Sequence, residues 1–312
     1  MTPGAARAVA HVRALGAAGR LPVPAARITI NFHPDRLLGD GRTVAEHLAA
    51  EGVYRSQFET RISNGGLTAY PGGDRDRWEQ RMFAGAYPSE VSAGRPVYGA
   101  LNLAGHPDGA APRFGSCHLR LRAAAAERAT YSHGDSVTEP EIVGTADAFG
   151  GIWAALLEQV ERTGQALGVN AAAAPEWIAA LTAPRREPGR TLDDYVEAQV
   201  HGGVDLATDV EAIVCDPAFA GTPTAGHLAT IAPLEWHPGF VLDAAGFGAQ
   251  LRGPDAERLA RALGPGPIDA AVIGAASHRT GDFAGFGDHA TVLQLLKYLW
   301  HILVIRGHAR RG

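Results

Sequence analysis

Short runs with the residue pattern of β-strands, bounded by glycine or proline, set the tightest limit on what this chain can fold into. Three of them, at 97–103, 116–122 and 129–132, have the length and the boundaries that are typical of antiparallel strands. Segments with helical spacing, such as 147–167 and 255–263, follow these runs. The order of the segments therefore predicts an α+β fold whose antiparallel strands carry polar groups on one face.

Two further runs alternate strictly between polar and apolar residues, which is the period of a strand with one buried face. In 28–33 the polar positions end with His33, and in 195–202 they include Glu197 and Gln199. Polar side chains that share one face of a strand indicate a cleft, whereas an ordinary solvated sheet face is the simpler interpretation.

Local signals place the remaining elements. Thr43 followed by Glu46 is a capping-box pattern and predicts a helix over 43–50. The other predicted elements are a strand at 53–59, a short helix at 209–214, an apolar strand at 270–274 and a C-terminal helix at 293–305.

The 312 residues carry a formal net charge of −5, which argues against nucleic-acid binding by charge alone. The stretch 293–305 is interrupted by Lys297 and is shorter than the ~20 residues that cross a bilayer, so it predicts a buried helix and no membrane span.

Two cysteines cannot form a disulfide framework. The first thirty residues hold no continuous apolar core. We therefore expect a cytoplasmic protein, with export without a signal peptide left open.

A loop rich in proline and arginine, at 183–190, is the best linker candidate. We expect a first domain over 1–215 that includes an N-terminal helix, and a C-terminal α-rich extension over 216–312. The extension is either a second domain or a part that completes the first.

Three polar side chains follow one another in an order that a known enzyme family shares. His33 ends the first strand, Tyr87 lies in MFAGAYPSE, and Glu197 lies in a strand late in the chain. With the glycine-rich loop NGGL at 64–67, this order resembles the His-Tyr-Glu arrangement of the ADP-ribosyltransferases over 28–215. The resemblance implies an antiparallel split sheet with a cleft. It also implies transfer of ADP-ribose from NAD to an unidentified acceptor, which is a protein, a nucleic acid or a small molecule.

The resemblance also implies roles for individual residues. Cleavage of the nicotinamide–ribose bond develops positive charge, which a carboxylate stabilises. Glu197 would be that carboxylate, and Gln199 would help to orient the acceptor. The residues expected to bind NAD are His33 at the adenosine ribose, Tyr87 on the nicotinamide ring, Arg55 or Arg36 at the pyrophosphate, and Asn64 in the glycine-rich loop.

A second resemblance covers most of the chain. The phrases NFHPDR, YRSQFETRISNGG, YPGGDRDRWEQRMFAGAY and YGALNL are similar to a bacterial family known only as a domain of unknown function, the 3626 family. This resemblance implies no activity.

Two other functions remain open. A metal-dependent hydrolase would use imidazole and carboxylate ligands, here His33, Asp35, His118 and Asp135, although the chain contains no H-E-x-x-H or C-x-x-C motif. A non-enzymatic binding module would use an exposed contact such as EWHPGF at 235–240, whose rings could equally pack a loop.

Overall fold

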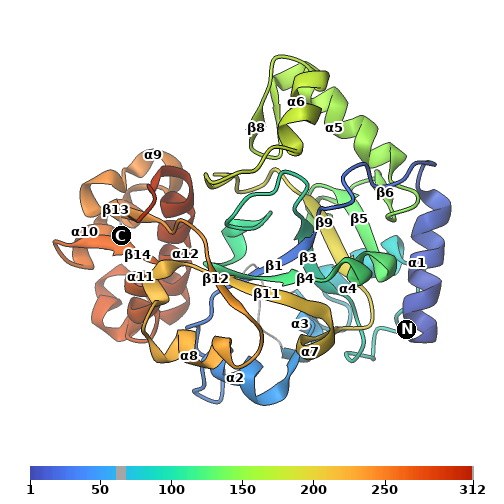
Figure 1. Cartoon of the computed structure of the whole chain (residues 1–312). Helices are drawn as coiled ribbons and strands as arrows, with labels where there is room; N and C mark the ends of the chain where they lie inside the picture. The colour runs from blue at the N-terminus through green and yellow to red at the C-terminus, as the bar shows by residue number, and fades with distance from the viewer. Residues whose placement is uncertain (61–67, 311–312) are drawn as a thin grey trace.

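The structure is a computed structural model that describes residues 1–60 and 68–310. Its centre is one eight-stranded sheet in the order β12-β11-β4-β1-β3-β9-β5-β6 (Figure 1). The strands are β1 (Ile28–Phe32), β3 (Val97–Leu101), β4 (Cys117–Leu121), β5 (Ala129–His133), β6 (Val143–Gly144), β9 (Val196–Val200), β11 (Val210–Cys215) and β12 (Leu234–Trp236). All neighbours are antiparallel except β11 and β12, which are parallel.

The predicted α+β fold with antiparallel strands is confirmed. The expected split of the sheet is a correction: the eight strands form a single continuous ladder, and the other described strands pair only two by two. These pairs are β2 (Val53–Tyr54) with β10 (Val204–Asp205), β7 (Gln165–Ala166) with β8 (Val169–Asn170), and β13 (Val241–Asp243) with β14 (Pro267–Asp269).

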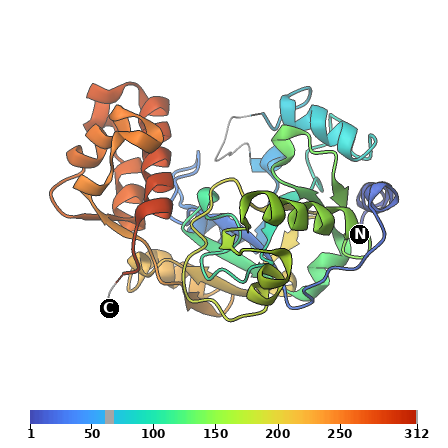
Figure 2. The ribbon, with the colours of Figure 1, turned by 90° about the horizontal axis from the view of Figure 1, so that it is seen from above.

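The helices surround the sheet and form a group of their own at the C-terminal end (Figures 1 and 2). They are α1 (Pro3–Leu15), α2 (Val44–Glu51), α3 (Gln57–Thr60), α4 (Asp74–Met82), α5 (Gly150–Thr163), α6 (Ala174–Leu181), α7 (Leu206–Asp209), α8 (Pro223–Ala229), α9 (Ala249–Arg252), α10 (Pro254–Ala262), α11 (Ala270–Ser277) and α12 (His289–Arg306). Among the described residues, no helix combines the length and the apolar character that a bilayer crossing needs.

The two faces of the sheet differ in chemistry because side chains alternate along each strand. Ile30, Leu119 and Ile213 lie in one row on the apolar face and join the main core. On the opposite face, Glu197 is in register with Ala100 and Ser132. The polar alternation predicted for 195–202 is therefore confirmed, and its polar side chains lie on a buried face.

Three predictions of single elements are wrong, because a short run of residues does not by itself distinguish a strand from a helix. Residues 270–274 belong to α11 instead of a strand, because the Asp269 side chain caps a helix by accepting from Val272 N. The predicted helix at 209–214 is wrong as well, because Asp209 ends α7 and residues 210–214 belong to strand β11. Only the start of 53–59 is a strand, since α3 begins at Gln57. The capping box of Thr43 and Glu46 is confirmed.

The C-terminal segment begins by completing the sheet. β12 pairs with β11, and only beyond it does the chain form the group that contains α9 to α12. In that group α12 packs against α10 and α11. Trp300 of α12 donates from Nε1 to the carbonyl of Pro112 at 2.7 Å, which holds the helix against the short turn η1 (Pro112–Phe114) beside the sheet.

Candidate functional site

The polar face of the sheet holds a buried carboxylate at Glu197. Only 6% of this residue is exposed, and Oε1 of its side chain accepts a hydrogen bond from Nε2 of Gln199 at 2.8 Å. Burial, followed by repulsion from nearby Asp135, raises the pKa of Glu197 to about 7. The side chain therefore changes charge near neutral pH, a property that is concentrated at functional sites.

A chain of hydrogen bonds runs from Gln199 to Tyr87. Thr130 donates to Oε1 of Gln199 at 2.8 Å, so its oxygen accepts from Nε2 of His201 at 3.0 Å. Nδ1 of His201 is then left to accept from the hydroxyl of Tyr87 at 2.6 Å. Burial lowers the pKa of His201 to about 3, so the imidazole is neutral and this pattern fixes its tautomer. The network holds Gln199, and through it Glu197, in one orientation.

Tyr87 lies in this network, with its ring in a small apolar cluster. The ring is nearly parallel to that of His201, with centroids 5.9 Å apart, and its hydroxyl joins the two rings edge to edge. It also packs edge-on against Phe83. Only 5% of Tyr87 is exposed, so its surroundings give little support to the expected role as a platform for nicotinamide.

Helix α4 brings a cation to the polar face. Gly73 precedes the helix because a Cβ there would meet the carbonyl oxygen of Thr68. Arg75 of α4 lies over the rings of Trp78 and Tyr98, at 4.8 and 4.3 Å from their centroids. Within the described ranges, its buried Nε and Nη1 have no hydrogen-bond partner. Arg75 is also among the charges that lower the pKa of Glu197 against the effect of burial.

Next to Arg75, a buried ion-pair cluster fixes α4 on the sheet. Arg95 is fully buried and pairs with Asp76 at 2.7 Å and with Glu79 at 2.9 Å. The hydroxyl of Tyr98 donates to Glu79 at 2.8 Å. Asp76 and Glu79 both pair with Arg95, and Arg75 forms no ion pair with a residue in the described part of the chain, although its charge also acts on Glu79.

The turn η3 (Ser136–Thr138) completes the surroundings of Glu197. Asp135 caps this turn through Val137 N and accepts from the hydroxyl of Tyr195 at 2.8 Å. The hydroxyl of Ser136 lies close to Glu197. Among the described residues, no atom meets both the distance and the angle of a hydrogen bond with this hydroxyl.

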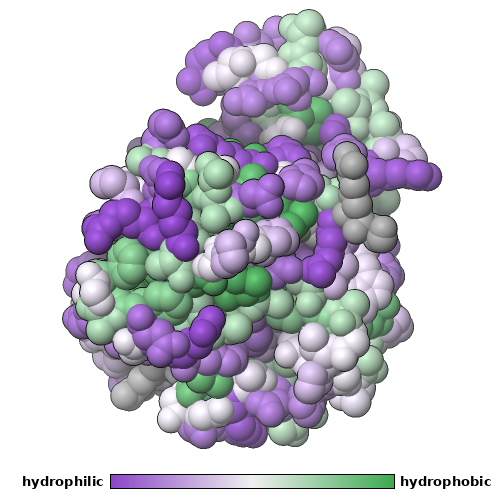
Figure 3. Space-filling model, turned by 90° about the vertical axis from the view of Figure 1, so that its left-hand side faces the viewer, coloured by the Kyte–Doolittle hydropathy of each residue, from purple (hydrophilic) through white to green (hydrophobic). Residues whose placement is uncertain are grey.

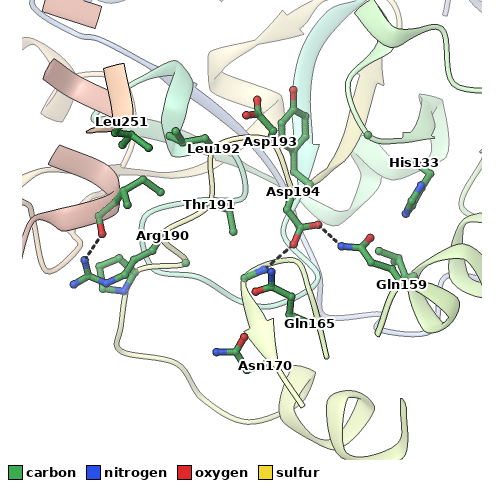
Figure 4. A pocket seen from close by; sticks show the side chains of 17 residues that line it. His133, Gln159, Gln165, Asn170, Arg190, Thr191, Leu192, Asp193, Asp194 and Leu251 are labelled. Carbon is green, nitrogen blue, oxygen red and sulfur yellow. Dashed lines mark hydrogen bonds between the residues drawn. The ribbon is translucent and has the colours of Figure 1, made fainter. Parts of the chain in front are cut away.

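A large cavity adjoins this cluster at Tyr195. It has a volume of about 730 Å³ and lies between α5, the β7–β8 pair, the loop before β9 and the C-terminal helices (Figure 4). In the space-filling view a hollow lies below the projecting upper part of the molecule (Figure 3). Asp194 in its wall accepts from Gln159 at 3.0 Å, and Arg190 donates to the carbonyls of Ile305 and Gly307. The cavity is large enough for a small organic ligand.

The other residues that the sequence assigned to NAD lie elsewhere. His33, Arg36 and Arg55 line a second cavity, of about 100 Å³, beside α2 and β2. The ring of His33 contacts Trp300 with centroids 5.3 Å apart, and burial lowers the pKa of His33 to about 3. Arg55 pairs with Glu51 at 2.9 Å. Asn64 lies outside the described residues.

The structure does not bring His33 to Glu197. Thr29 of β1, Ala100 of β3 and Glu197 of β9 share one row, and His33 lies four residues further along the chain from Thr29. With usual strand dimensions, the two Cα atoms are roughly 16 Å apart. Of the predicted trio, only Tyr87 and Glu197 belong to one hydrogen-bonded network.

The candidate metal ligands do not meet either. Within residues 1–60 and 68–310, no group of three or more histidine, cysteine or acidic side chains has the spacing to hold a metal ion. Asp135 lies beside Glu197, whereas the carboxyl of Asp35 lies close to Gly274 of α11. In the 235–240 segment, buried His237 contacts the carbonyl of Ser116 at 2.9 Å. Trp236 beside it is 44% exposed.

Sequence patterns did not group Glu197 with the residues that surround it, namely Arg75, Tyr98, Thr130, Ser132, Asp135 and Tyr195. Among these, only Asp135 was a candidate, as a metal ligand. Two local signals were present. The alternation in 129–132 marks Thr130 and Ser132 as sharing one face, and the alternation in 195–202 places Tyr195 on the face of Glu197. Arg75 reaches the site only through the packing of α4 on the sheet.

The fold and this cluster define a mixed helix–sheet protein with a buried polar face and an adjoining cavity. Comparison with known sequences identifies the family of the chain. A family described as "Protein of unknown function (DUF3626)" matches residues 27–306, and the chain belongs to that family. The chain is also 30% identical over 170 residues to the Gene 2 protein of Mycobacterium phage L5. That match covers 54% of this chain and 59% of the phage protein.

Proposed function

We propose that this protein transfers ADP-ribose from NAD to an acceptor, with the reaction centre at Glu197. The proposal is carried by one observation: a buried carboxylate on the sheet lies near the guanidinium of Arg75, whose hydrogen bonds are incomplete. NAD has the matching chemistry. Its ribose develops positive charge when nicotinamide leaves, and its pyrophosphate is anionic.

In the proposed reaction, the carboxylate of Glu197 accepts a hydrogen bond from a ribose hydroxyl. The bond between C1′ and the nicotinamide nitrogen breaks, its electron pair leaves with nicotinamide, and the carboxylate stabilises the positive charge on the ribose. A lone pair of the acceptor then bonds to C1′, and the acceptor loses its proton to solvent. Gln199 is a positioning residue that holds Glu197, and Arg75 binds a phosphate oxygen.

This assignment keeps the role that the resemblance to the ADP-ribosyltransferases implies for Glu197. It changes the role of Gln199, which holds Glu197 instead of orienting the acceptor, and it changes the residue that binds the phosphate. Arg36 and Arg55 line a separate cavity, so we assign the phosphate to Arg75 instead. Aromatic rings flank Arg75, and the cavity of about 730 Å³ next to Tyr195 gives room for the acceptor or for the adenosine part of NAD.

The test is release of nicotinamide from NAD by the purified full chain, with water and with mixed acceptors. Glu197→Gln keeps the shape and removes the charge, so we expect a rate lower by about 10²–10³-fold. Arg75→Gln should mainly raise KM for NAD, because it loses a phosphate contact. Glu158→Gln on the exposed face of α5 is the matched control and should be unchanged.

Absence of nicotinamide release by the wild-type protein under all these conditions would reject the proposal. Equal rates for the wild-type protein and Glu197→Gln would reject the assigned role of Glu197.

A further inference from the structure

A second cluster of polar side chains lies where the C-terminal helices meet the sheet. Arg113 comes from η1, Arg252 from α9, and Lys297 and His301 from α12. The bond from Trp300 to the carbonyl of Pro112 holds η1 against α12, so the fold brings these elements together. Lys297 is the only lysine of the chain.

This cation cluster, Arg113, Arg252, Lys297 and His301, has unsatisfied hydrogen-bonding groups. His301 is 2% exposed, and both of its ring nitrogens lack a partner among the described residues. The same holds for the buried Nε atoms of Arg113 and Arg252. Burial lowers the pKa of His301 to about 3, so its neutral ring donates from one nitrogen only. Buried polar atoms are nearly always hydrogen-bonded, so this N–H and the two arginine Nε atoms, three unpartnered donors, indicate a bound group that supplies acceptors.

The charges in the cluster are nearly all of one sign. The charged groups that bear on Lys297 are Arg113, Arg252 and Arg36, and together with burial they lower its pKa. Arg113 has an ion pair with the exposed Asp193. Neither Arg252 nor Lys297 has an ion pair with a residue in the described part of the chain. Cations gathered in this way repel one another unless an anion lies between them.

The geometry points to a binding site for a phosphate-bearing ligand in the cation cluster. Guanidinium groups bind phosphate oxygens through paired hydrogen bonds, and an ammonium group adds a point charge. A diphosphate has enough oxygens to meet these three donors, and enough charge to offset Arg252 and Lys297, the two cations of the cluster that have no ion pair with a described residue. A carboxylate has two oxygens and one charge, so it fits less well.

The cluster is open to such a ligand. Arg113, Arg252 and Lys297 are each partly exposed. Leu251, the neighbour of Arg252, and Ile305, one helical turn beyond His301, line the cavity of about 730 Å³. A phosphate group at the cluster can therefore carry an organic part that extends into this cavity. The site stands whether or not Glu197 reacts with NAD.

The first test is calorimetric titration of the full chain with inorganic pyrophosphate at constant ionic strength. We expect saturable one-to-one binding, and at least a tenfold higher Kd for Lys297→Gln and for Arg252→Gln. Arg162→Gln is the matched control, because it removes the same charge from an exposed site on α5 and should bind like the wild-type protein. Glu197→Gln should also bind normally, which separates this site from the proposed reaction.

Further titrations identify the source of the phosphate. Tighter binding of ADP than of pyrophosphate would assign a nucleotide, and equal binding would assign the phosphate groups alone. No binding of orthophosphate, pyrophosphate, AMP or ADP at millimolar concentration would overturn the proposal. Binding that both cluster variants retain unchanged would overturn it too.

The second test needs no variant. Because Lys297 is the only lysine, an amine-reactive acetylating reagent labels it and the N-terminal amine, and peptide mass spectrometry separates the two. Pyrophosphate should slow labelling of Lys297 at least fivefold and leave the N-terminal rate unchanged. Equal rates for Lys297 with and without pyrophosphate would contradict its place in the site.

Discussion

Two polar clusters lie on this protein, and they differ in how completely their hydrogen bonds are formed. In the network from Glu197 to Tyr87, Gln199, Thr130 and His201 each donate or accept with defined partners. In the cation cluster, both nitrogens of His301 are unpartnered among the described residues. The first arrangement satisfies its hydrogen bonds within the protein, whereas the second leaves buried polar atoms without a partner among the described residues.

This difference separates two uses of buried polarity. A satisfied network holds a side chain in place, as Gln199 holds Glu197, and breaking it costs stability. An unsatisfied cluster already has a cost in the free protein, so removing one of its members should relieve strain. We therefore expect removal of a side chain from the satisfied network to lower the free energy of unfolding, and removal of an equivalent side chain from the cation cluster to raise it.

The largest effect is expected next to the network, at Arg95. Replacing it with alanine leaves the buried carboxylates of Asp76 and Glu79 without their cation and should lower the free energy of unfolding by about 3–5 kcal/mol. Urea unfolding followed by circular dichroism measures this change. Arg77→Ala, which removes the exposed pair with Asp74, should cost under about 1 kcal/mol. A similar loss in free energy of unfolding for the two variants would contradict the role of the buried Arg95 ion pairs in holding α4 on the sheet.

Glu197 itself gives a pH-dependent prediction. Burial raises its pKa from 4.5 to about 7, so between these values the native protein holds a proton that the unfolded chain releases. Its favourable contribution to stability is therefore complete below pH 4.5 and is lost as pH rises through 7. Glu197→Gln should match the wild-type protein near pH 4 and exceed it by about 3 kcal/mol at pH 8. Urea unfolding at each pH tests this, with Glu158→Gln as the control.

A difference between the two proteins that does not change between pH 4 and 8 would show that Glu197 titrates normally. It would also remove the buried carboxylate from the proposed reaction centre.

A matched pair of histidines compares the clusters directly. His201→Leu leaves the hydroxyls of Tyr87 and Thr130 with a lost partner, and should lower the free energy of unfolding by about 2 kcal/mol. His301→Leu breaks no hydrogen bond with a described residue and should be neutral or stabilising. Both are measured by urea unfolding in phosphate-free buffer. Equal destabilisation by the two variants would abolish the distinction between the clusters.

The sequence was a good guide where the signal is local. The capping box at Thr43 lies within one turn of helix, and the alternation around Glu197 gave the correct strand and face. It failed for 270–274, where the apolar run is too short to separate a strand from a helix and the Asp269 cap decides. Local patterns therefore predicted helices and strands better than they predicted which distant residues lie side by side in the fold.

The composition of the sites depends on contacts between distant segments. His33 was grouped with Glu197 because of their order in the chain, but the sheet register sets them apart. Arg75 joins Glu197 only because α4 packs on the polar face. Lys297 was seen only as an interruption in an apolar helix, since nothing near it in the sequence shows that Arg113 and Arg252 surround it. Such placements follow from tertiary packing, which one sequence does not display.

The smallest effect on the free energy of unfolding is expected at Lys297. This prediction also tests whether the cation cluster binds pyrophosphate. Lys297→Met removes a cation that its neighbours repel, and should raise the free energy of unfolding by about 1 kcal/mol in phosphate-free buffer. Pyrophosphate should raise the melting temperature of the wild-type protein, because a ligand that binds the native state stabilises it, and should raise that of Lys297→Met much less. The order of the two melting temperatures should therefore reverse at saturating pyrophosphate, whereas Arg162→Gln should follow the wild-type protein throughout. Thermal unfolding by circular dichroism records both conditions. A variant that is less stable than the wild-type protein without phosphate would show that the free cluster is already satisfied.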